Sequence, residues 1–240
     1  MMLRITNLTK LYKNGRGLSE LNLFVEKGQT YGFLGPNGSG KTTTLKLIVG
    51  LLTRDSGAIE FMGREISEHF EQSMAKIGCM FETAMLYNGL SAYENILFVA
   101  RYFPEIQRSR INELLDMVGL AGVQKEKVAR FSLGMRQRLA LAQAMYNHPQ
   151  LMILDEPLNG LDIQGIIEVR GIIKNLAREG ATFIISSHIA GEVEKTCTNV
   201  GILYSGKLIC EDTVEEILKH HPSIEDYYIS KTKENCNAAV

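Results

Sequence analysis

The sequence predicts an α/β fold: a mainly parallel sheet core covered by helices, an antiparallel β part at the N-terminus and an inserted helical lobe. Two observations support this prediction. Short apolar runs alternate with helical patterns near both ends of the chain, whereas the middle shows helical periodicity alone. We expect one domain over residues 1–240, with a body at residues 1–83 and 148–220, the helical lobe at residues 84–147, and a C-terminal tail at residues 221–240.

Strand periodicity opens the body. Apolar side chains alternate over residues 21–25, and the E-K-G-Q turn that follows favours a hairpin with an apolar strand at residues 30–34. Apolar residues then recur at i, i+3, i+4 and i+7, which is typical of an amphipathic helix: Leu45, Ile48, Val49 and Leu52. Further strands are expected at residues 58–62, after the turn residues D-S-G, and at residues 77–81.

Helical spacing dominates the middle of the chain. Ser91 and Glu94 form an S-x-x-E pattern, which is typical of a capping box at a helix N-terminus. Apolar residues then repeat at helical spacing before Gly119: Ile111, Leu114, Leu115 and Val118. This stretch predicts the helical lobe.

The second part of the body follows the lobe. Buried strands are expected at residues 151–154 and 182–186, and a closing hairpin is expected over residues 200–210. The helix between the two strands is marked by Ile166, Val169, Ile173 and Leu176. A second capping box is expected at residues 213–216. The polar residues 231–240 have little to bury, so we expect a frayed end there.

Composition limits the classes of partner. The formal net charge of -1 provides no general positive field, so no nucleic-acid partner is expected. The cysteines are scattered without a C-x-x-C pair, which argues against a zinc site or a disulfide framework: Cys79, Cys197, Cys210 and Cys236. The N-terminus does not resemble a signal peptide, and no run approaches the ~18 apolar residues of a membrane-spanning helix. We therefore expect a cytoplasmic protein.

A glycine-rich loop carries the first chemical signal. Residues Gly35–Thr42 read G-P-N-G-S-G-K-T, a full match to G-x-x-x-x-G-K-[ST] between an expected strand and an expected helix. In such a loop, backbone N–H groups and the helix N-terminus hold phosphates, while the lysine reaches the β- and γ-phosphates and the Thr ligates Mg²⁺. The alternative is a glycine-rich turn with a solvated lysine. We expect ATP contacts from Gly35, Pro36, Asn37, Gly38, Ser39, Gly40, Lys41, Thr42 and Thr43.

An acidic pair follows the strand that begins at Leu151. Asp155 ends this strand at the carboxyl edge of the sheet, where it can hold Mg²⁺ together with Thr42. Glu156 comes next, and a carboxylate at this place is suited to polarise the water that attacks the γ-phosphate. The alternative is that two acids simply end a strand.

Further segments identify the family. Residues 131–138 read F-S-L-G-M-R-Q-R, residues 159–162 read N-G-L-D, and residues 186–188 read S-S-H. Together with L-D-E-P at residues 154–157, they resemble the signature, D-loop and switch histidine of ABC ATPases in order and spacing, over roughly residues 3–218. The resemblance implies the ABC-type phosphate-loop ATPase fold and two subunits that close over two bound ATP molecules.

The resemblance also implies roles for single residues. Ser132 at a helix N-cap, with the N–H of Gly134, would face the γ-phosphate of ATP held by the opposite subunit. His188 would contact the γ-phosphate, Asp162 would contact the partner subunit, and Tyr12 would stack on adenine. Taken alone, the same residues are compatible with ordinary helix caps, a strand-end histidine and a packing tyrosine.

Departures from the family pattern narrow the assignment. Glu82 stands where most members carry glutamine; it keeps an oxygen ligand for Mg²⁺ but adds a charge. The usual L-S-G-G-Q becomes F-S-L-G-M, with Leu133 and Met135 replacing a glycine and a polar residue. These features, with M-L-Y-N-G-L-S-A-Y-E-N-I, resemble the subfamily that exports bacitracin-like and lantibiotic peptides for self-protection. The alternative is drift in a general exporter.

The resulting function is an ATP-hydrolysing transporter subunit that uses ATP and Mg²⁺. It would work at the cytoplasmic face of the membrane with a second ATPase subunit and with separate membrane permease subunits. One alternative is an ABC ATPase that acts on ribosomes or nucleic acid, whose usual marks are two cassettes in one chain or a long coiled-coil insertion. A small-molecule kinase with a phosphate loop would need an arginine-rich lid in place of F-S-L-G-M.

Overall fold

The computed structural model describes residues 1–81 and 86–238; Glu82, with the rest of residues 82–85, lies outside the described residues. The strands are β1 (Leu3–Leu11), β2 (Gly17–Val25), β3 (Thr30–Leu34), β4 (Ser56–Phe61), β5 (Arg64–Glu65), β6 (Ile77–Met80), β7 (Leu151–Asp155), β8 (Thr182–Ser187), β9 (Asn199–Tyr204) and β10 (Lys207–Thr213). The helices are α1 (Lys41–Ile48), α2 (Phe70–Met74), α3 (Ala92–Ala100), α4 (Ser109–Met117), α5 (Leu133–Ala144), α6 (Ile163–Arg178), α7 (Ala190–Thr196), α8 (Val214–His220) and α9 (Ile224–Ala238).

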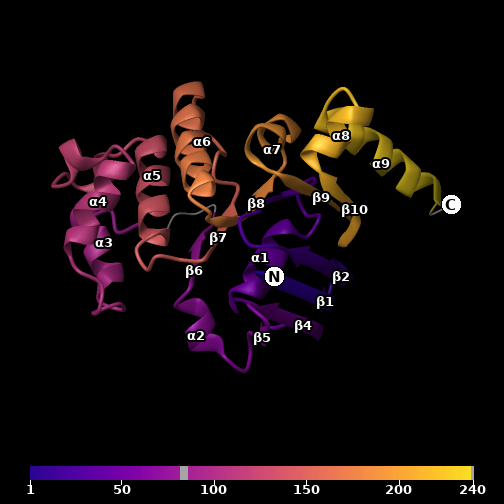
Figure 1. Ribbon diagram of the computed structural model, residues 1–240, viewed down its shortest axis with the longest axis horizontal. Coiled ribbons are helices and arrows are strands. Elements are labelled where there is room, and N and C mark those ends of the chain that lie inside the picture. The colour runs from indigo at the N-terminus through magenta and orange to yellow at the C-terminus, as the bar shows by residue number, and fades with distance from the viewer. Residues whose placement is uncertain (82–85, 239–240) are drawn as a thin grey trace.

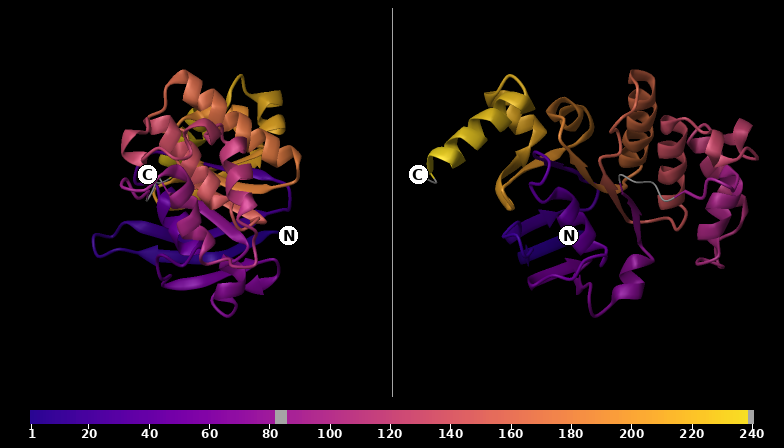
Figure 2. Two further views of the ribbon diagram at one scale, coloured as in Figure 1. Left: turned by 90° about the vertical axis from the view of Figure 1, so that its left-hand side faces the viewer. Right: turned by 180° about the vertical axis from the view of Figure 1, so that it is seen from behind.

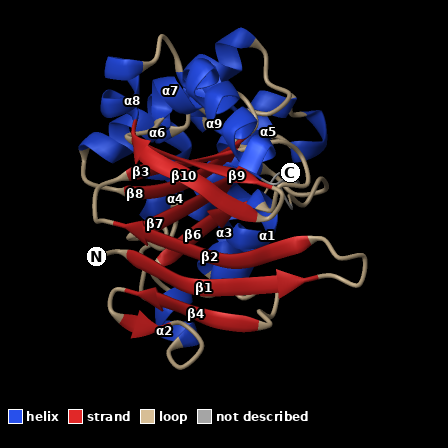
Figure 3. Cartoon of the chain, turned by 90° about the vertical axis from the view of Figure 1, so that its right-hand side faces the viewer, coloured by secondary structure: helices blue, strands red, loops and turns tan. Residues whose placement is uncertain are grey.

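Two sheets form the centre of the molecule. The larger sheet has the order β10-β9-β3-β8-β7-β6, and its neighbours are parallel except for the antiparallel hairpin of β9 and β10. The smaller sheet is antiparallel, with the order β2-β1-β4-β5. Figure 3 shows it below the larger sheet, whose upper face is covered by helices. The predicted α/β class, with a mainly parallel core and an antiparallel N-terminal part, is confirmed.

The predicted hairpin over residues 21–34 is wrong. β2 pairs with β1, where Leu3 lies opposite Val25, whereas β3 enters the other sheet between β8 and β9. The period of apolar residues predicts a strand but does not select its partner. Burial distinguishes the two strands: β2 alternates between buried and exposed positions near its end, and every residue of β3 is buried. A strand buried on both faces belongs inside a parallel sheet.

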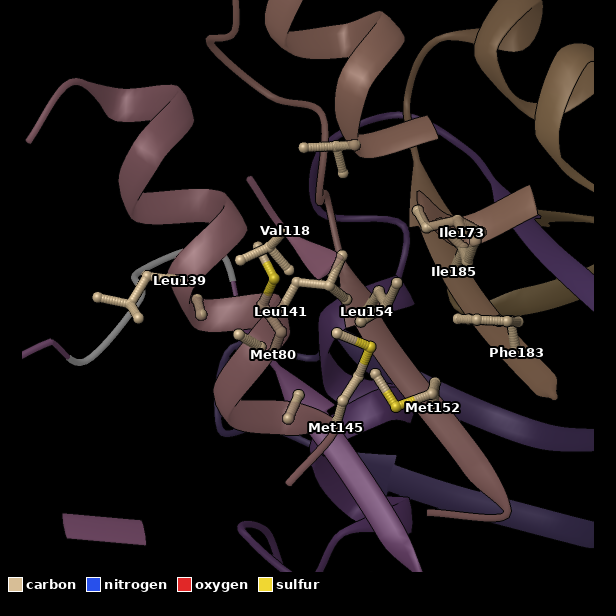
Figure 4. Packing of buried hydrophobic residues seen from close by; sticks show 14 of the residues in the cluster. Met80, Val118, Leu139, Leu141, Met145, Met152, Leu154, Ile173, Phe183 and Ile185 are labelled. Atoms are coloured by element: carbon tan, nitrogen blue, oxygen red, sulfur yellow. The ribbon is translucent and has the colours of Figure 1, made fainter. Parts of the chain in front are cut away.

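The core lies on both faces of the larger sheet. Alternate residues of a strand point to opposite faces, so Leu151 and Ile153 of β7 join one cluster while Met152 and Leu154 join the other. The cluster that contains Met152 and Leu154 also includes buried residues of α3, α4, α5 and α6. Figure 4 shows Met152 and Leu154 next to side chains of α5 and β6. Flexible methionine side chains fill this junction: Met80, Met145 and Met152.

Helices α3, α4 and α5 lie together at one end of the molecule, and α8 and α9 lie at the other (Figures 1 and 2). The predicted capping box is formed: the Glu94 N–H donates to Ser91 Oγ at 3.2 Å, and the Ser91 N–H donates to Glu94 Oε2 at 2.8 Å. The four apolar residues that predicted α4 are all buried: Ile111, Leu114, Leu115 and Val118.

Two expectations near helix ends need correction. Leu52 was expected on the first helix, but α1 ends at Ile48 and Gly50 adopts a φ of 72°, which turns the chain away. The C-terminal residues are helical through Ala238 instead of frayed, since Ile224 and Tyr227 bury one side of α9. Among the described residues, no helix is both long enough and apolar enough to cross a membrane.

The second capping box is half formed. The Glu216 N–H donates to Thr213 Oγ1 at 3.1 Å, but the Glu216 carboxylate is bound by Lys219 and His220. The Glu216 side chain therefore supports the following turn of α8 instead of the backbone at its start.

Candidate functional site

The glycine-rich loop joins β3 to α1. Gly40 adopts a φ of 112° directly before the helix, a conformation that residues with a Cβ rarely adopt. At Gly35 a Cβ would lie 2.2 Å from the carbonyl oxygen of Leu203, so a larger residue does not fit. The Lys41 ammonium curls back over the loop and donates to the carbonyl oxygens of Gly35 at 2.7 Å and Pro36 at 3.3 Å. The loop thus has the geometry of a phosphate cradle with a cation at its centre.

The first acid of the pair lies beside the start of α1. Thr42 Oγ1 donates to Asp155 Oδ2 at 3.0 Å, and Asp155 is buried at the end of β7. Parallel strands end at the same edge of a sheet, so β3 and β7 bring these side chains together although 113 residues separate them. A hydroxyl and a carboxylate are oxygen ligands of the kind that Mg²⁺ prefers. This pair could hold the ion.

The second acid lies between two nitrogen groups. One Glu156 oxygen, Oε1, lies 3.4 Å from Lys41 Nζ, and the other, Oε2, lies 2.9 Å from Nδ1 of His188. Glu156 has a φ of 50°, a conformation that costs on the order of 1–3 kcal/mol for a non-glycine residue. Such strain occurs at active sites where a side chain has to point in an unusual direction. The arrangement can orient a carboxylate as a general base.

Sequence reasoning missed Ser186 as a functional residue. Its hydroxyl donates to Asp155 Oδ1 at 2.6 Å and accepts the backbone N–H of Glu156 at 2.9 Å. It lies on β8 directly opposite Asp155. The sequence shows two adjacent serines, and only the register of β8 against β7 reveals which of them faces the acids.

A cavity of ≈ 490 Å³ is lined by residues of the phosphate loop together with Glu156 and His188; Asp155 and Ser186 are not among its lining residues. Tyr12 is one of the lining residues; its hydroxyl is 3.4 Å from Thr43 Oγ1, and the residue is 40% exposed. Further lining residues were not expected from the sequence. They come from the loop between β1 and β2 and from the segment after Glu156: Asn14, Arg16, Gly17 and Asn159.

Three predicted contacts from outside the phosphate loop and the acidic pair also lie outside this cavity: Ser132, Gly134 and Asp162. Ser132 is the N-cap of α5, where its hydroxyl accepts the Met135 N–H at 3.3 Å, and Gly134 lies in the first turn. Asp162 is the N-cap of α6 and accepts the Gly165 N–H at 2.8 Å. The N-terminus of α5 is therefore exposed and lies outside the cavity of its own chain.

The described cysteines form no part of this arrangement. Cys79, Cys197 and Cys210 carry free thiols, and burial raises the pKa of Cys197 to about 12. A thiol with so high a pKa stays protonated and is a poor nucleophile.

Comparison with known proteins places this geometry in a family. Residues 18–159 match the family described as ABC transporter. The bacitracin transport ATP-binding protein BcrA of Bacillus licheniformis is 40% identical over 230 residues, which cover 95% of this chain and 75% of the relative. The lantibiotic transport ATP-binding protein SrtF of Streptococcus pyogenes is 45% identical over 210 residues, which cover 88% of this chain and 90% of the relative.

A solved structure shares the fold. The dimeric structure of an ATP-binding cassette in a post-hydrolysis state, bound to ADP and Pi, has a TM-score of 0.79 and 27% identity and covers 89% of this chain and 99% of that chain. The resemblance to bacitracin and lantibiotic transport subunits is confirmed, and a transporter subunit is supported over an ABC ATPase acting on ribosomes or nucleic acid. The chain belongs to the ABC transporter family, in which it is an ATP-binding subunit that hydrolyses ATP.

Proposed function

We propose that two cassettes form each ATP site and that hydrolysis drives the transport of a peptide antibiotic through membrane subunits. One observation carries the first part: residues of the phosphate loop share a cavity with Glu156 and His188, whereas the caps at Ser132 and Asp162 do not line it. A helix N-terminus attracts anions, so that of α5 is suited to phosphate held by another chain.

The predicted site residues of this chain have the following proposed roles. Lys41 neutralises charge on the β- and γ-phosphates, and Thr42 and Asp155 hold Mg²⁺. When bound, Mg²⁺ supplies charge neutralisation between the β- and γ-phosphates. Glu156 orients and deprotonates the attacking water, while His188 fixes the second carboxylate oxygen and contacts the γ-phosphate. Tyr12 stacks on adenine.

The surface beside Ser132 supports association with a second cassette. Leu133 is 48% exposed and Ile163 is 79% exposed, although both side chains are apolar. The segments that carry them lie side by side. Gly160, three residues before Ile163, is so close to Leu133 that a Cβ added to Gly160 would lie 3.0 Å from Leu133 Cδ2. Apolar residues gathered next to two exposed helix N-termini are typical of an interaction surface. We expect the rate of ATP hydrolysis per chain to rise with protein concentration; a constant rate for a proven monomer would contradict a two-chain site.

The proposed cargo comes from the relatives, whose names include bacitracin and lantibiotic transport. The chain would act at the cytoplasmic face of the membrane, bound to permease subunits that select the peptide. Glu82, whose structure lies outside the described residues, remains a candidate Mg²⁺ ligand and a link to the permease by its place in the sequence.

A survival experiment tests the cargo. Cells carrying the complete transporter should survive higher doses of bacitracin or a lantibiotic than cells whose transporter carries Glu156→Gln at equal protein level. A panel of unrelated small drugs serves as the control. Protection against those drugs but not against the peptides would favour another cargo.

A further inference from the structure

We propose that Ser186 is a positioning residue for ATP hydrolysis, whose hydroxyl joins the carboxylate of Asp155 to the backbone of Glu156. The inference rests on the proposed roles of these two acids and adds a residue to their site. Its basis is the hydroxyl's position between the two acids, with a donated bond of 2.6 Å on one side and an accepted bond of 2.9 Å on the other.

The surroundings make this hydroxyl hard to replace. Ser186 is 0% exposed, and its partner Asp155 is 2% exposed. A buried N–H or carboxylate that loses its partner pays the cost of desolvation without compensation. The hydroxyl is the group that satisfies the Glu156 N–H in the described structure. Removing it would leave that amide unpaired at the point where the chain leaves β7.

The backbone of Glu156 gives the contact its functional meaning. The residue has a φ of 50°, and this turn directs its carboxylate toward His188 and Lys41. A strained conformation persists only where its surroundings hold it in place. The bond from the Glu156 N–H to Ser186 fixes one end of this residue, and the contacts with His188 and Lys41 fix the other end.

The neighbouring serine provides a contrast. Ser187 follows on the same strand but points to the other side, where its hydroxyl accepts the Ile189 N–H at 3.0 Å. It belongs to the turn into α7, where its hydroxyl lies between the N–H and the carbonyl oxygen of Ile189. A Ser187→Ala variant is therefore a matched control for the loss of one serine hydroxyl from this strand.

The test is steady-state ATP hydrolysis by the purified chain, with folding followed by thermal unfolding. Ser186→Ala should lower kcat about 10- to 100-fold, because a misdirected general base loses its alignment with the water. The KM for ATP should change by less than about threefold, because the phosphate loop is untouched. Ser187→Ala should change kcat by less than about twofold.

Two further variants distinguish the loss of the hydroxyl group from a general disturbance of packing at position 186. Ser186→Thr keeps the hydroxyl and should stay within about fivefold of the wild-type kcat. Ser186→Cys fills similar space with a weaker hydrogen-bonding group and should fall between the Thr and Ala variants. Equal kcat values for the Ala, Cys and Thr variants, with folding intact, would overturn the proposal.

A double-mutant cycle shows whether Ser186 acts through Glu156. In a Glu156→Gln background, Ser186→Ala should reduce kcat by less than about threefold more, because the group it positions is already disabled. Fully additive losses would overturn the positioning role while leaving the general base in place. Near-normal turnover by Glu156→Gln alone would instead overturn the role proposed for Glu156.

Discussion

The body and the helical segment that carries the signature hold their functional residues in different ways. In the body, Glu156 lies 3.4 Å from Lys41 and 2.9 Å from His188, and Thr42 donates a hydrogen bond to Asp155. In the signature, the Ser132 hydroxyl accepts the Met135 N–H at the N-terminus of its own helix. The groups of the body therefore lie close to one another, whereas the N-terminus of α5 is exposed. The proposed two-chain site would account for this difference.

The largest expected effect concerns the body. Glu156→Gln should keep ATP binding but slow hydrolysis about 10²- to 10⁴-fold, because an amide cannot accept a proton from water. ATP should then accumulate in a closed dimer, which size-exclusion chromatography with and without ATP would detect. If the variant binds ATP normally but stays monomeric at all ATP concentrations, the expectation that blocked hydrolysis traps a closed dimer is contradicted.

A smaller effect is expected at the edge of the cavity. Tyr12→Ala should weaken ATP binding about 5- to 150-fold, which corresponds to the loss of one base–aromatic stack. Tyr12→Phe keeps the ring and is the control; it should bind ATP nearly as well as the wild type. Isothermal titration with ATP measures both. Equal losses in the two variants would assign the contribution to the hydroxyl near Thr43 instead of the ring.

The smallest expected effects are losses of local stability when a helix cap is removed, at α3 in the helical lobe and at α8 in the body. Ser91→Ala removes the two hydrogen bonds that the Ser91 hydroxyl makes with Glu94 at the start of α3, and it should cost about 0.5–2 kcal/mol of local stability. Thr213→Ala removes a single cap bond at α8 and should cost less. Amide hydrogen exchange would show the loss in α3 and in α8 separately. Faster exchange throughout the chain after Ser91→Ala would mean that the two regions unfold together.

Much of the fold follows from local patterns. Helical spacing and caps predicted α3, α4 and α6, and apolar runs predicted the buried strands. The pairing of the strands could not be predicted, because apolar residues alternate in the same way whichever strand lies alongside. β2 and β3, which are neighbours in the sequence, pair in different sheets. α9 was missed since its apolar residues are few and become buried only against a distant part of the chain.

The residues of the candidate site also fall into those that the sequence predicted and those that only the structure revealed. The contiguous motif was enough to predict Lys41 and Thr42, and the acid at the end of an apolar strand was enough to predict Asp155 beside them; their roles remain proposals. Ser186 and Arg16 could not be found this way, because their places depend on sheet register and on a loop that folds over the cavity. Glu82 lies outside the described residues, so its role is still a prediction from the sequence.

The central claim is that one chain's phosphate loop works with the signature of another, and a mixing experiment tests it most directly. Lys41→Ala disables the loop and Ser132→Arg blocks the signature, so each variant alone should hydrolyse almost no ATP. Mixed in equal amounts, half of the dimers would hold one intact site, and activity should recover to about a quarter of the wild-type value if the sites act independently. No recovery, from variants that fold and exchange subunits, would contradict the two-chain site.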